Sequence, residues 1–388
     1  MGANGSARLE RLPAGGLVCV VGARPNFMKV APILRALAVA DPPFPVSLVH
    51  TGQHYGPDMQ EAFFHQLGLP QPDIDLEVGS ASHAAQTGEI MTRFEEVVDA
   101  VAPEAVLVVG DVNSTLACSL VAAKKGVAVT HVEAGLRSGD RAMPEEINRV
   151  LTDQLATLHF TTETGARDHL LREGIDPDGI HFVGNVMIDS LLHHRDTAVA
   201  AGETLERYLP PEATEIPTEG FALVTLHRPS NVDDPEVLRE LVETLEQVSE
   251  RLPLVFPVHP RTRGALEAVG WPRGRRHPVM VLPPVGYLEM LGLMAGSRLV
   301  LTDSGGMQEE TTALGIPCIT LRENTERPVT LEQGTNTLTG TDRRRILETV
   351  DDVLATGGKG GRVPELWDGR AGERIADVLA DWAPLTPW

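Results

Sequence analysis

The feature that most constrains the fold is a repeated alternation of short apolar runs with amphipathic segments. The apolar runs match buried strands, and the segments between them carry the spacing of helices that cover one face of a sheet. This alternation is typical of parallel sheets joined by helical crossovers. We predict two series of strands, the first at residues 17–21, 46–50, 105–109, 127–132, 159–161 and 181–183, and the second at 221–226, 254–257, 279–282, 298–301 and 318–321.

Two series of strands in 388 residues predict an α/β protein with two Rossmann-like, doubly wound domains that face a cleft. The weakly periodic stretch 195–220, rich in Ala, Glu, Pro and Thr, is interpreted as the hinge region. The expected segments are a disordered leader at 1–16, an N-terminal Rossmann-like domain at 17–195, a C-terminal Rossmann-like domain at 196–365, and a C-terminal helix at 366–388 that packs back on the first domain.

The charge balance limits the partners of this chain. Its 54 acidic and 33 basic residues give a net charge of −21, which argues against nucleic acid and anionic membranes as partners. The first residues lack the apolar core of a signal peptide, so a cytoplasmic protein is expected. Cys19, Cys118 and Cys318 are scattered through apolar segments, which favours buried thiols over a disulfide or a metal site.

Carboxylates follow two of the predicted strands in the first domain. Glu133 comes directly after the run 127–132 and Asp111 closely follows the run 105–109, at the strand ends where open α/β sheets bind ligands. A carboxylate directly after an apolar strand requires a partner. Glu145 and Glu146 open a helix after Pro144, so helix capping is an alternative for them, as it is for Asp111.

Two loops have the composition of anion-binding turns. The segment 303–310 follows a predicted strand and opens a helix with Ser304, Gly305 and Gly306, where backbone amides and the helix dipole favour an anion such as a diphosphate. The segment 22–29 occupies the matching place in the first domain and supplies Arg24 and Lys29. Together the loops predict one anionic ligand in the cleft between the domains, although tight strand-to-helix turns are the alternative.

Further charged groups end strands of the second domain. His227 and Arg228 follow the run 221–226, and His259 follows the run 254–257, so both histidines are expected at one sheet edge. Satisfied structural histidines are the alternative. Glu326 and Arg327 follow the last predicted strand and either bind a ligand or form a salt bridge. The sequence has no helical pair of metal ligands and no Walker-type loop, so we predict no metal and no cofactor.

An ordered set of motifs over about residues 17–345 closely resembles the non-hydrolysing UDP-N-acetylglucosamine 2-epimerases. The motifs, in chain order, are GARPNFMKVAP, TGQH, VVGDVNSTLA, HVEAGLRSGDRAMPEEINR, VGNVMIDSL, TLHRPSN, FPVHPRTR and the long stretch from LTDSGGMQEE to TGTD. The resemblance implies a two-domain fold of the glycosyltransferase B type and a homodimer. It also implies reversible epimerisation at sugar carbon 2 by elimination of UDP, a 2-acetamidoglucal intermediate and re-addition, without nicotinamide.

The same resemblance assigns roles to individual residues. The catalytic set is Asp111, Glu133, Glu145 and His227, with the identity of the base left open because clustered carboxylates titrate together. Arg24, Ser304, Gly305 and Gly306 are expected to hold the diphosphate, and Glu310 the ribose hydroxyls. The remaining expected substrate-binding residues are Lys29, Gln53, His54, Arg137, Arg149, Arg228, His259 and Arg327.

Other functions stay open at this point. A hydrolysing 2-epimerase would release UDP and free N-acetylmannosamine, and a glycosyltransferase of the same fold would need an acceptor but not the acidic cluster. A UDP-sugar sensor without catalysis is the remaining alternative.

Gln53 and His54 lie in a loop that binds a second, activating UDP-sugar in several bacterial family members. Asn26 and Pro229 replace the Glu and Arg that many of those relatives carry.

Overall fold

The computed structural model describes residues 12–52, 64, 67–208, 220–271, 279–382 and 385. The chain divides into two compact units, of which unit 1 comprises residues 1–190 and 365–388 and unit 2 comprises residues 191–364. The division falls five residues before the boundary expected at residue 195. The reason lies in helix α8 (Val186–His194), where the Ser190 hydroxyl donates to the Met28 carbonyl of unit 1 and the His194 ring contacts Tyr287 of unit 2.

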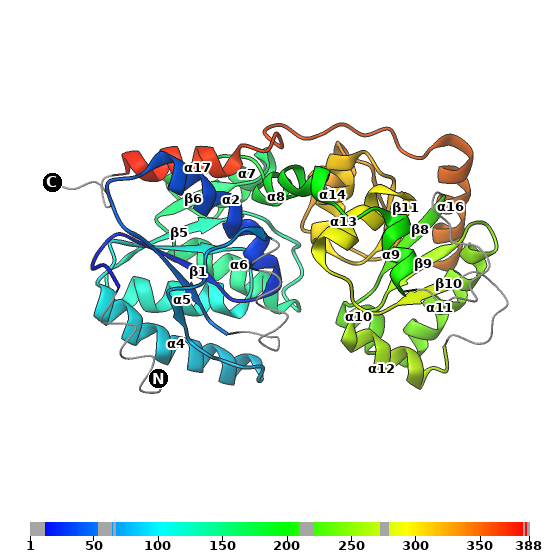
Figure 1. The fold of residues 1–388 in the computed structure, drawn as a ribbon, viewed down its shortest axis with the longest axis horizontal. Coiled ribbons are helices and arrows are strands. Elements are labelled where there is room, and N and C mark those ends of the chain that lie inside the picture. Colours follow the sequence, from blue (N-terminus) through cyan, green and yellow to red (C-terminus); the bar gives the residue numbers. More distant parts are fainter. Residues whose placement is uncertain are drawn as a thin grey trace. The chain divides into compact units, whose positions relative to one another are not determined.

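Unit 1 is built on one parallel sheet of seven strands in the order β3-β2-β1-β4-β5-β6-β7 (Figure 1). Near-continuous apolar runs form its central strands, as expected for strands covered on both faces. The strands are β1 (Leu17–Val21), β2 (Val46–His50), β3 (Ile74–Asp75), β4 (Ala105–Val109), β5 (Ala128–Val132), β6 (Leu158–Thr161) and β7 (Ile180–Phe182).

The helices of unit 1 cross over between these strands and are α2 (Arg24–Ala40), α4 (His83–Val101), α5 (Asn113–Lys124), α6 (Pro144–Leu155) and α7 (Thr164–Arg172), with a 3-10 turn at Pro177–Gly179. Proline stands in the first turn of α2 and of α6, where its missing N–H costs nothing. Both helices therefore begin at a defined point just beyond the sheet edge where β1 and β5 end.

The last helix, α17 (Ala371–Asp381), packs against α2 (Figure 1). Both oxygens of Asp189 accept backbone N–H groups at its start, from Ala371 at 3.1 Å and Gly372 at 2.7 Å. The Trp367 indole donates to the Thr162 carbonyl at 2.9 Å. The returning chain is thus fixed to unit 1 by hydrogen bonds as well as by packing.

Unit 2 repeats the plan with a parallel sheet of six strands in the order β10-β9-β8-β11-β12-β13. The strands are β8 (Phe221–Thr225), β9 (Leu254–Pro257), β10 (Val279–Leu282), β11 (Ser297–Thr302), β12 (Cys318–Thr320) and β13 (Asn336–Leu338). The helices are α9 (Ala201–Tyr208), α10 (Pro229–Val232), α11 (Pro235–Ser249), α12 (Pro260–Ala268), α13 (Tyr287–Ala295), α14 (Gly305–Leu314), α15 (Pro328–Glu332) and α16 (Arg343–Thr356), with a 3-10 turn at Arg195–Thr197.

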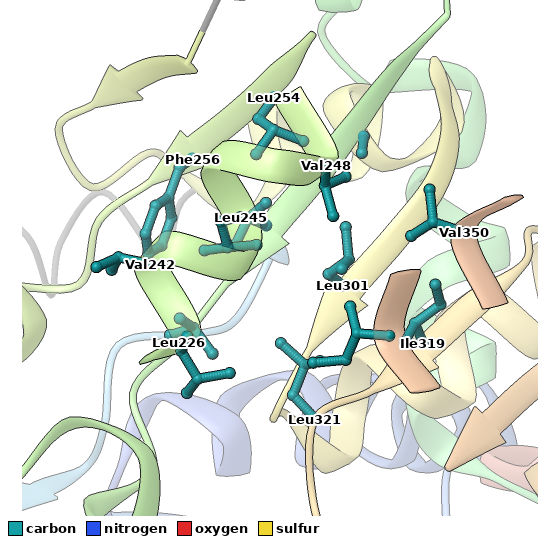
Figure 2. Close-up of a cluster of buried hydrophobic side chains, with 14 of the residues drawn as sticks. Leu226, Val242, Leu245, Val248, Leu254, Phe256, Leu301, Ile319, Leu321 and Val350 are labelled. Atoms are coloured by element: carbon teal, nitrogen blue, oxygen red, sulfur yellow. The ribbon is translucent and has the colours of Figure 1, made fainter. Parts of the chain in front are cut away.

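The core of unit 2 lies between its sheet and the helices α11 and α16 (Figure 2). Leu245 and Val248 of α11 meet Phe256 and Leu301 of the sheet, and all four side chains are almost fully buried. Burying each such side chain contributes about 1.5–3 kcal/mol. This packing fixes the strand ends from which the functional loops leave.

One expectation about the N-terminus needs correction. Residues 1–11 of the expected disordered leader lie outside the described residues, but residues 12–16 are ordered. Leu12 packs against the core of unit 1, and the Gly15 N–H donates to the Val101 carbonyl at 2.8 Å. An apolar side chain next to the sheet and a satisfied backbone group explain why the ordered structure begins before β1.

The three cysteines are free and buried. Burial in apolar surroundings raises the pKa of the Cys19 and Cys318 thiols to about 12. Within the described part of the chain, no three His, Cys, Asp or Glu side chains gather as metal ligands. Among the same residues, no helix has the length and apolar character needed to cross a bilayer.

Candidate active site

The candidate residues of unit 1 lie where the strand order changes direction, between β1 and β4. Asn26 ties these two strand ends together. Its side-chain oxygen accepts the N–H groups of Gly22 and Ala23 at 3.1 and 3.0 Å, and its amide donates to the Val109 carbonyl at 2.9 Å. In open α/β sheets this switch point is the usual place for a ligand.

Glu133 and Lys29 form a buried ion pair at this edge. Their side chains are 2% and 8% exposed, and the ammonium group donates to the carboxylate oxygen Oε2. Gly110 makes room for the pair, because a Cβ at this position would lie 2.7 Å from Lys29 Nζ. Lys29 therefore partners a carboxylate in this structure, whereas the sequence suggested a phosphate-facing role.

The backbone of Glu133 is strained. Its φ of +69° lies in the left-handed region, which a residue with a Cβ adopts at a cost of about 1–3 kcal/mol. Strain of this kind persists when the surroundings fix the conformation. Here two contacts fix it: the ion pair of Glu133 with Lys29, and the hydrogen bond that the Ala134 N–H donates to the Phe160 carbonyl. Such residues concentrate at functional sites.

Asp111 belongs to a second cluster, centred on the buried guanidinium of Arg149. Arg149 Nη1 lies 2.5 Å from Asp111 Oδ2, and Nη2 lies 2.7 Å from Glu146 Oε2. Asn148 adds a 2.8 Å bond from its amide to the Asp111 carbonyl. Arg149 therefore holds two carboxylates of unit 1 in place.

Of the two consecutive acids on α6, Glu146 is the buried one and Glu145 is half-buried. Burial alone would raise the pKa of Glu146, but the N–H groups of Ser138 and Gly139 and the charge of Arg149 hold it below its ordinary value. Glu146 thus fixes the loop before α6. Glu145 keeps partial access to solvent.

Arg137 lies in a structural network. Its guanidinium bridges Asp153 at 2.7 Å and Glu173 at 2.6 Å, and Asp153 also holds the His131 ring at 2.6 Å and the Gly135 N–H at 3.0 Å. Burial would raise the pKa of Asp153, but His131 and Arg137 lower it below its ordinary value. This network supports the turn that follows β5.

In unit 2 the strand order changes direction between β8 and β11, and His227 and Asp303 follow these two strands. The His227 Nδ1 atom lies 3.0 Å from Asp303 Oδ1. Asp303 is fully buried, whereas the His227 side chain is 38% exposed. His259 lies nearby, with its ring centroid 5.9 Å from that of His227, so both histidines share one sheet edge as predicted.

The helix α14 presents its N-terminus at the same edge. Ser304 is the residue before the first turn, and Gly305 and Gly306 form the start of the helix. Gly305 is required for space, because a Cβ there would lie 2.6 Å from Glu326 Oε1. Free N–H groups and the helix dipole make such a terminus suited to an anion.

Three arginines and two glutamates lie beside this terminus. Arg322 pairs with Glu326 at 2.8 Å, Arg228 lies 3.7 Å from Glu326, and Arg327 pairs with Glu309 at 2.6 Å. Burial alone would raise the pKa of Glu326, but the three arginines hold it far below its ordinary value. The guanidinium groups of this cluster and the N-terminus of α14 supply hydrogen-bond donors of the kind that bind an anionic ligand.

Glu310 lies on the first turns of α14 and is 5% exposed. The Tyr287 hydroxyl donates to its Oε1 atom at 3.3 Å. A carboxylate held in this way accepts hydrogen bonds from hydroxyl groups of a ligand. The expected contact to ribose hydroxyls therefore has suitable chemistry.

The structure thus gathers the predicted residues in two groups, one in each unit. Lys29, Glu133, Asp111 and Arg149 belong to unit 1, and the His227 to Arg327 set belongs to unit 2. Gln53, His54 and the side chain of Arg24 lie outside the described parts. Sequence reasoning missed the roles of Asp303, Glu146 and Arg322, although Asp303 and Glu146 stand in segments that it had singled out. For Glu326 the structure shows the salt bridge that was one of the two alternatives.

The two parallel sheets define the class of protein, an α/β protein with two Rossmann-like domains and a glycosyltransferase-B-like fold. A family model described as UDP-N-acetylglucosamine 2-epimerase matches residues 38–380. The chain belongs to this UDP-N-acetylglucosamine 2-epimerase family.

Relatives cover nearly the whole chain. The UDP-N-acetylglucosamine 2-epimerase of Methanococcus maripaludis is 39% identical over 93% of this chain and 97% of its own length. The UDP-2,3-diacetamido-2,3-dideoxy-D-glucuronate 2-epimerase of Pseudomonas aeruginosa is also 39% identical, over 94% of this chain and 99% of its own. A crystal structure of the Methanocaldococcus jannaschii UDP-GlcNAc 2-epimerase with UDP-GlcNAc and UDP has a TM-score of 0.85 at 38% identity, covering 94% and 99% of the two chains.

Proposed function

We propose that the chain interconverts UDP-N-acetylglucosamine and UDP-N-acetylmannosamine without net loss of UDP. The observation that carries the proposal is the buried carboxylate of Glu133, paired with Lys29 in a strained backbone conformation at the switch point of unit 1. Glycosyltransferases use the same fold but do not need such an acidic cluster. The solved M. jannaschii epimerase with UDP-GlcNAc and UDP supports the choice of substrate.

The reaction requires departure of UDP before carbon 2 can lose its proton, since an unactivated carbon 2 proton is too weakly acidic for a carboxylate. The bond from carbon 1 to the β-phosphate oxygen breaks, and its electron pair leaves with UDP. The cationic sugar then gives its carbon 2 proton to a base and becomes a 2-acetamidoglucal. Protonation of the opposite face and re-addition of UDP give the epimer, so atoms and charges balance.

We assign binding and departure of UDP to unit 2. Negative charge builds on the diphosphate as UDP departs. The N-terminus of α14 and the arginine-rich cluster beside it can stabilise this charge, because their hydrogen-bond donors are already in place. His227 gives or takes a proton at the departing diphosphate. Glu310 accepts the ribose hydroxyls. Lys29 is left out of this group because Glu133 binds it.

We assign cation stabilisation and proton transfer to unit 1. Glu133 and Asp111 are both held by cations, which keeps their carboxylates oriented, and Glu145 is half-buried on the neighbouring helix. Paired carboxylates around a sugar ring parallel those of glycosidases, where one stabilises the cation and another moves the proton. Which carboxylate is the base stays open in this proposal.

The test is to incubate the purified protein with UDP-N-acetylglucosamine in heavy water and to follow the sugar carbon 2 proton and free UDP by NMR. Deuterium incorporation with the manno isomer and little free UDP is the expected result. Accumulation of UDP with free N-acetylmannosamine would contradict it and indicate a hydrolysing enzyme. An inert sugar would also contradict it and would direct the test to an acceptor-dependent transfer.

A second candidate substrate follows from the P. aeruginosa relative, which acts by its name on UDP-2,3-diacetamido-2,3-dideoxy-D-glucuronate and is as similar to this chain as the M. maripaludis enzyme. The same heavy-water experiment with that sugar nucleotide separates the two substrates.

We also expect a homodimer, and light scattering after size exclusion would show twice the mass of one chain.

A further inference from the structure

The pairing of β8 with β11 brings a histidine and an aspartate side by side. Thr225 and Thr302 are register partners near the ends of these strands, so the residues that follow leave the sheet at the same edge. His227 Nδ1 lies 3.0 Å from Asp303 Oδ1. The imidazole keeps 38% of its side chain exposed, whereas the carboxylate is fully buried. One member of the pair thus faces solvent and the other faces the protein.

The carboxylate of Asp303 is fixed from several directions. It accepts the backbone N–H of His227 at 3.0 Å, that of Arg228 at 2.9 Å and the side-chain amide of Asn231 at 3.1 Å. Burial would raise the pKa of Asp303, but the hydrogen bonds and charge from His227 and the Arg228 N–H lower it below its ordinary value. Asp303 is therefore an ionised acceptor that cannot turn away from the histidine.

An ionised carboxylate only accepts hydrogen bonds, so the proton on the facing ring nitrogen belongs to Nδ1. In the neutral ring this leaves the lone pair on Nε2. We propose that Asp303 is a positioning residue, which holds the Nδ1–H group of the His227 ring. Nε2 is then the atom that gives a proton to departing UDP, which leaves the neutral Nδ1–H tautomer, and that takes the proton back on re-addition. The inference rests on the proposed function for the role of His227, but the tautomer itself does not.

The other charged groups near His227 do not compete for this nitrogen. His259, at the end of β9, directs its Nδ1 atom to the Arg261 N–H at 3.2 Å. The Arg228 guanidinium lies 3.7 Å from Glu326. Among the residues that the structure describes, Asp303 is thus the anionic group at hydrogen-bond distance from the His227 ring. The same arrangement, a base oriented by a buried carboxylate, recurs in unrelated catalytic sites.

A purely structural reading predicts something different. If Asp303 only closes the turn after β8 by accepting N–H groups, its replacement should lower stability without changing the His227 tautomer or the kcat of the folded protein. The two readings therefore separate in spectroscopic and kinetic measurements rather than in a loss of activity alone.

The first measurement is the tautomer of His227 in the wild-type protein without substrate, by long-range proton–nitrogen NMR on histidine-labelled protein. His227→Gln assigns the signal. We expect the Nδ1–H form to predominate in the neutral ring, and a predominant Nε2–H form would overturn the inference. Because no variant of Asp303 is needed here, the result does not depend on whether such a variant folds.

The second measurement compares Asp303→Asn with the wild type. We expect kcat to fall about 100-fold, in the range usual for loss of proton-transfer catalysis. The Nδ1–H tautomer of His227 should also lose its predominance in the variant, because the Asn amide can donate to Nδ1 whereas the carboxylate only accepts. Asp234→Asn is the matched control: Asp234 accepts N–H groups at the start of α11 and contacts no histidine, so neither quantity should change.

The outcomes separate this inference from the proposed function. If the wild type epimerises the sugar and a folded Asp303→Asn protein keeps its kcat and the Nδ1–H tautomer, the inference is wrong and the function stands. If the wild type shows the Nδ1–H tautomer but no epimerisation, the proposed function is wrong and the catalytic part of the inference falls with it.

Discussion

Unit 1 and unit 2 share one plan and differ at the ends of their strands. Each has a parallel sheet whose order changes direction once, with helices as crossovers. At its switch point unit 1 has carboxylates that form ion pairs with Lys29 and Arg149. Unit 2 instead has a helix N-terminus, two neighbouring histidines and the cluster of three arginines and two glutamates. The scaffold sets where a ligand binds, and the loops set what happens to it.

The comparison predicts that damage to unit 1 affects the chemistry at the sugar ring and that damage to unit 2 affects the binding and departure of UDP. The largest effect is expected for Glu133→Gln. Loss of the carboxylate should lower kcat by about 10²–10⁴-fold, the usual contribution of a proton-transfer group. It should also lower the free energy of unfolding by about 3–5 kcal/mol, because Lys29 stays buried without its anion.

Deuterium incorporation at carbon 2 and urea unfolding measure these two effects. Glu89→Gln is the control, since Glu89 pairs with Arg93 on the exposed face of α4. A Glu133→Gln protein with wild-type kcat would show that the chemistry lies elsewhere.

The next effect concerns stability and pH in unit 2. Glu326→Gln should lower the free energy of unfolding by about 3–5 kcal/mol at neutral pH, because it leaves Arg322 without its buried partner. The arginines depress the pKa of Glu326, so its contribution is fully present above the ordinary glutamate pKa of about 4.3 and is lost as pH falls toward the depressed value.

Urea unfolding at several pH values measures the difference between the wild type and Glu326→Gln. This difference should be constant from about pH 8 to 6 and should shrink below about pH 4.3. Glu348→Gln removes the exposed pair with Arg344 and should cost less than about 1 kcal/mol. A difference that grows as the pH falls would refute the assigned charge state.

A smaller effect is expected for Gly305→Ala. The added Cβ would lie 2.6 Å from Glu326 Oε1, and that carboxylate is held by arginines and cannot retreat freely. We expect the start of α14 to shift and UDP to bind about 10-fold more weakly, which is about 1.4 kcal/mol. Calorimetric titration with UDP measures the change.

Gly264→Ala is the matched control for this substitution. Gly264 lies in α12, where a Cβ would meet nothing within 4 Å, so UDP affinity should be unchanged. Equal UDP affinity in Gly305→Ala and the wild type would show that the nucleotide does not bind at this helix terminus.

The smallest effect tests the attachment of α17 to unit 1. Asp189→Ala removes the acceptor for the first two N–H groups of that helix, a loss of about 1 kcal/mol. Hydrogen exchange of the α17 amides should become faster, while UDP affinity, which we assign to unit 2, should not change. Asp196→Ala, at an exposed position, is the control. Unchanged exchange in α17 would show that packing against α2 alone holds the helix.

The sequence predicted most of the sheet because its central strands are almost entirely apolar. The runs at 17–21, 46–50 and 105–109 coincide with β1, β2 and β4. The strands β3 and β13 were missed, because two or three residues with a polar member at the edge of a sheet carry little hydrophobic signal. Edge strands are held by backbone pairing to one neighbour, which sequence patterns do not show.

The sequence predicted where the site residues lie in the fold better than it predicted which side chains they contact. A carboxylate that directly follows an apolar strand identified Glu133, and the same argument applied to 298–301 could have identified Asp303. The resemblance selected Glu145 for the catalytic set, but the sequence did not show that Glu146 is the buried one, because consecutive helix positions differ by about 100° and packing decides which one is buried. The partners of Arg137 and Lys29 required the structure, since they come from distant positions in the chain.

The most direct test of the division between the units is a calorimetric titration of UDP into Glu133→Gln, next to the wild type. If unit 1 performs the chemistry at the sugar ring and unit 2 holds the nucleotide, the two UDP dissociation constants should agree within about twofold. This difference is well under the 1.4 kcal/mol that corresponds to a tenfold change, although the variant no longer exchanges the carbon 2 proton. A folded variant that binds UDP tenfold more weakly would contradict the account, because Glu133 would then contribute to nucleotide binding.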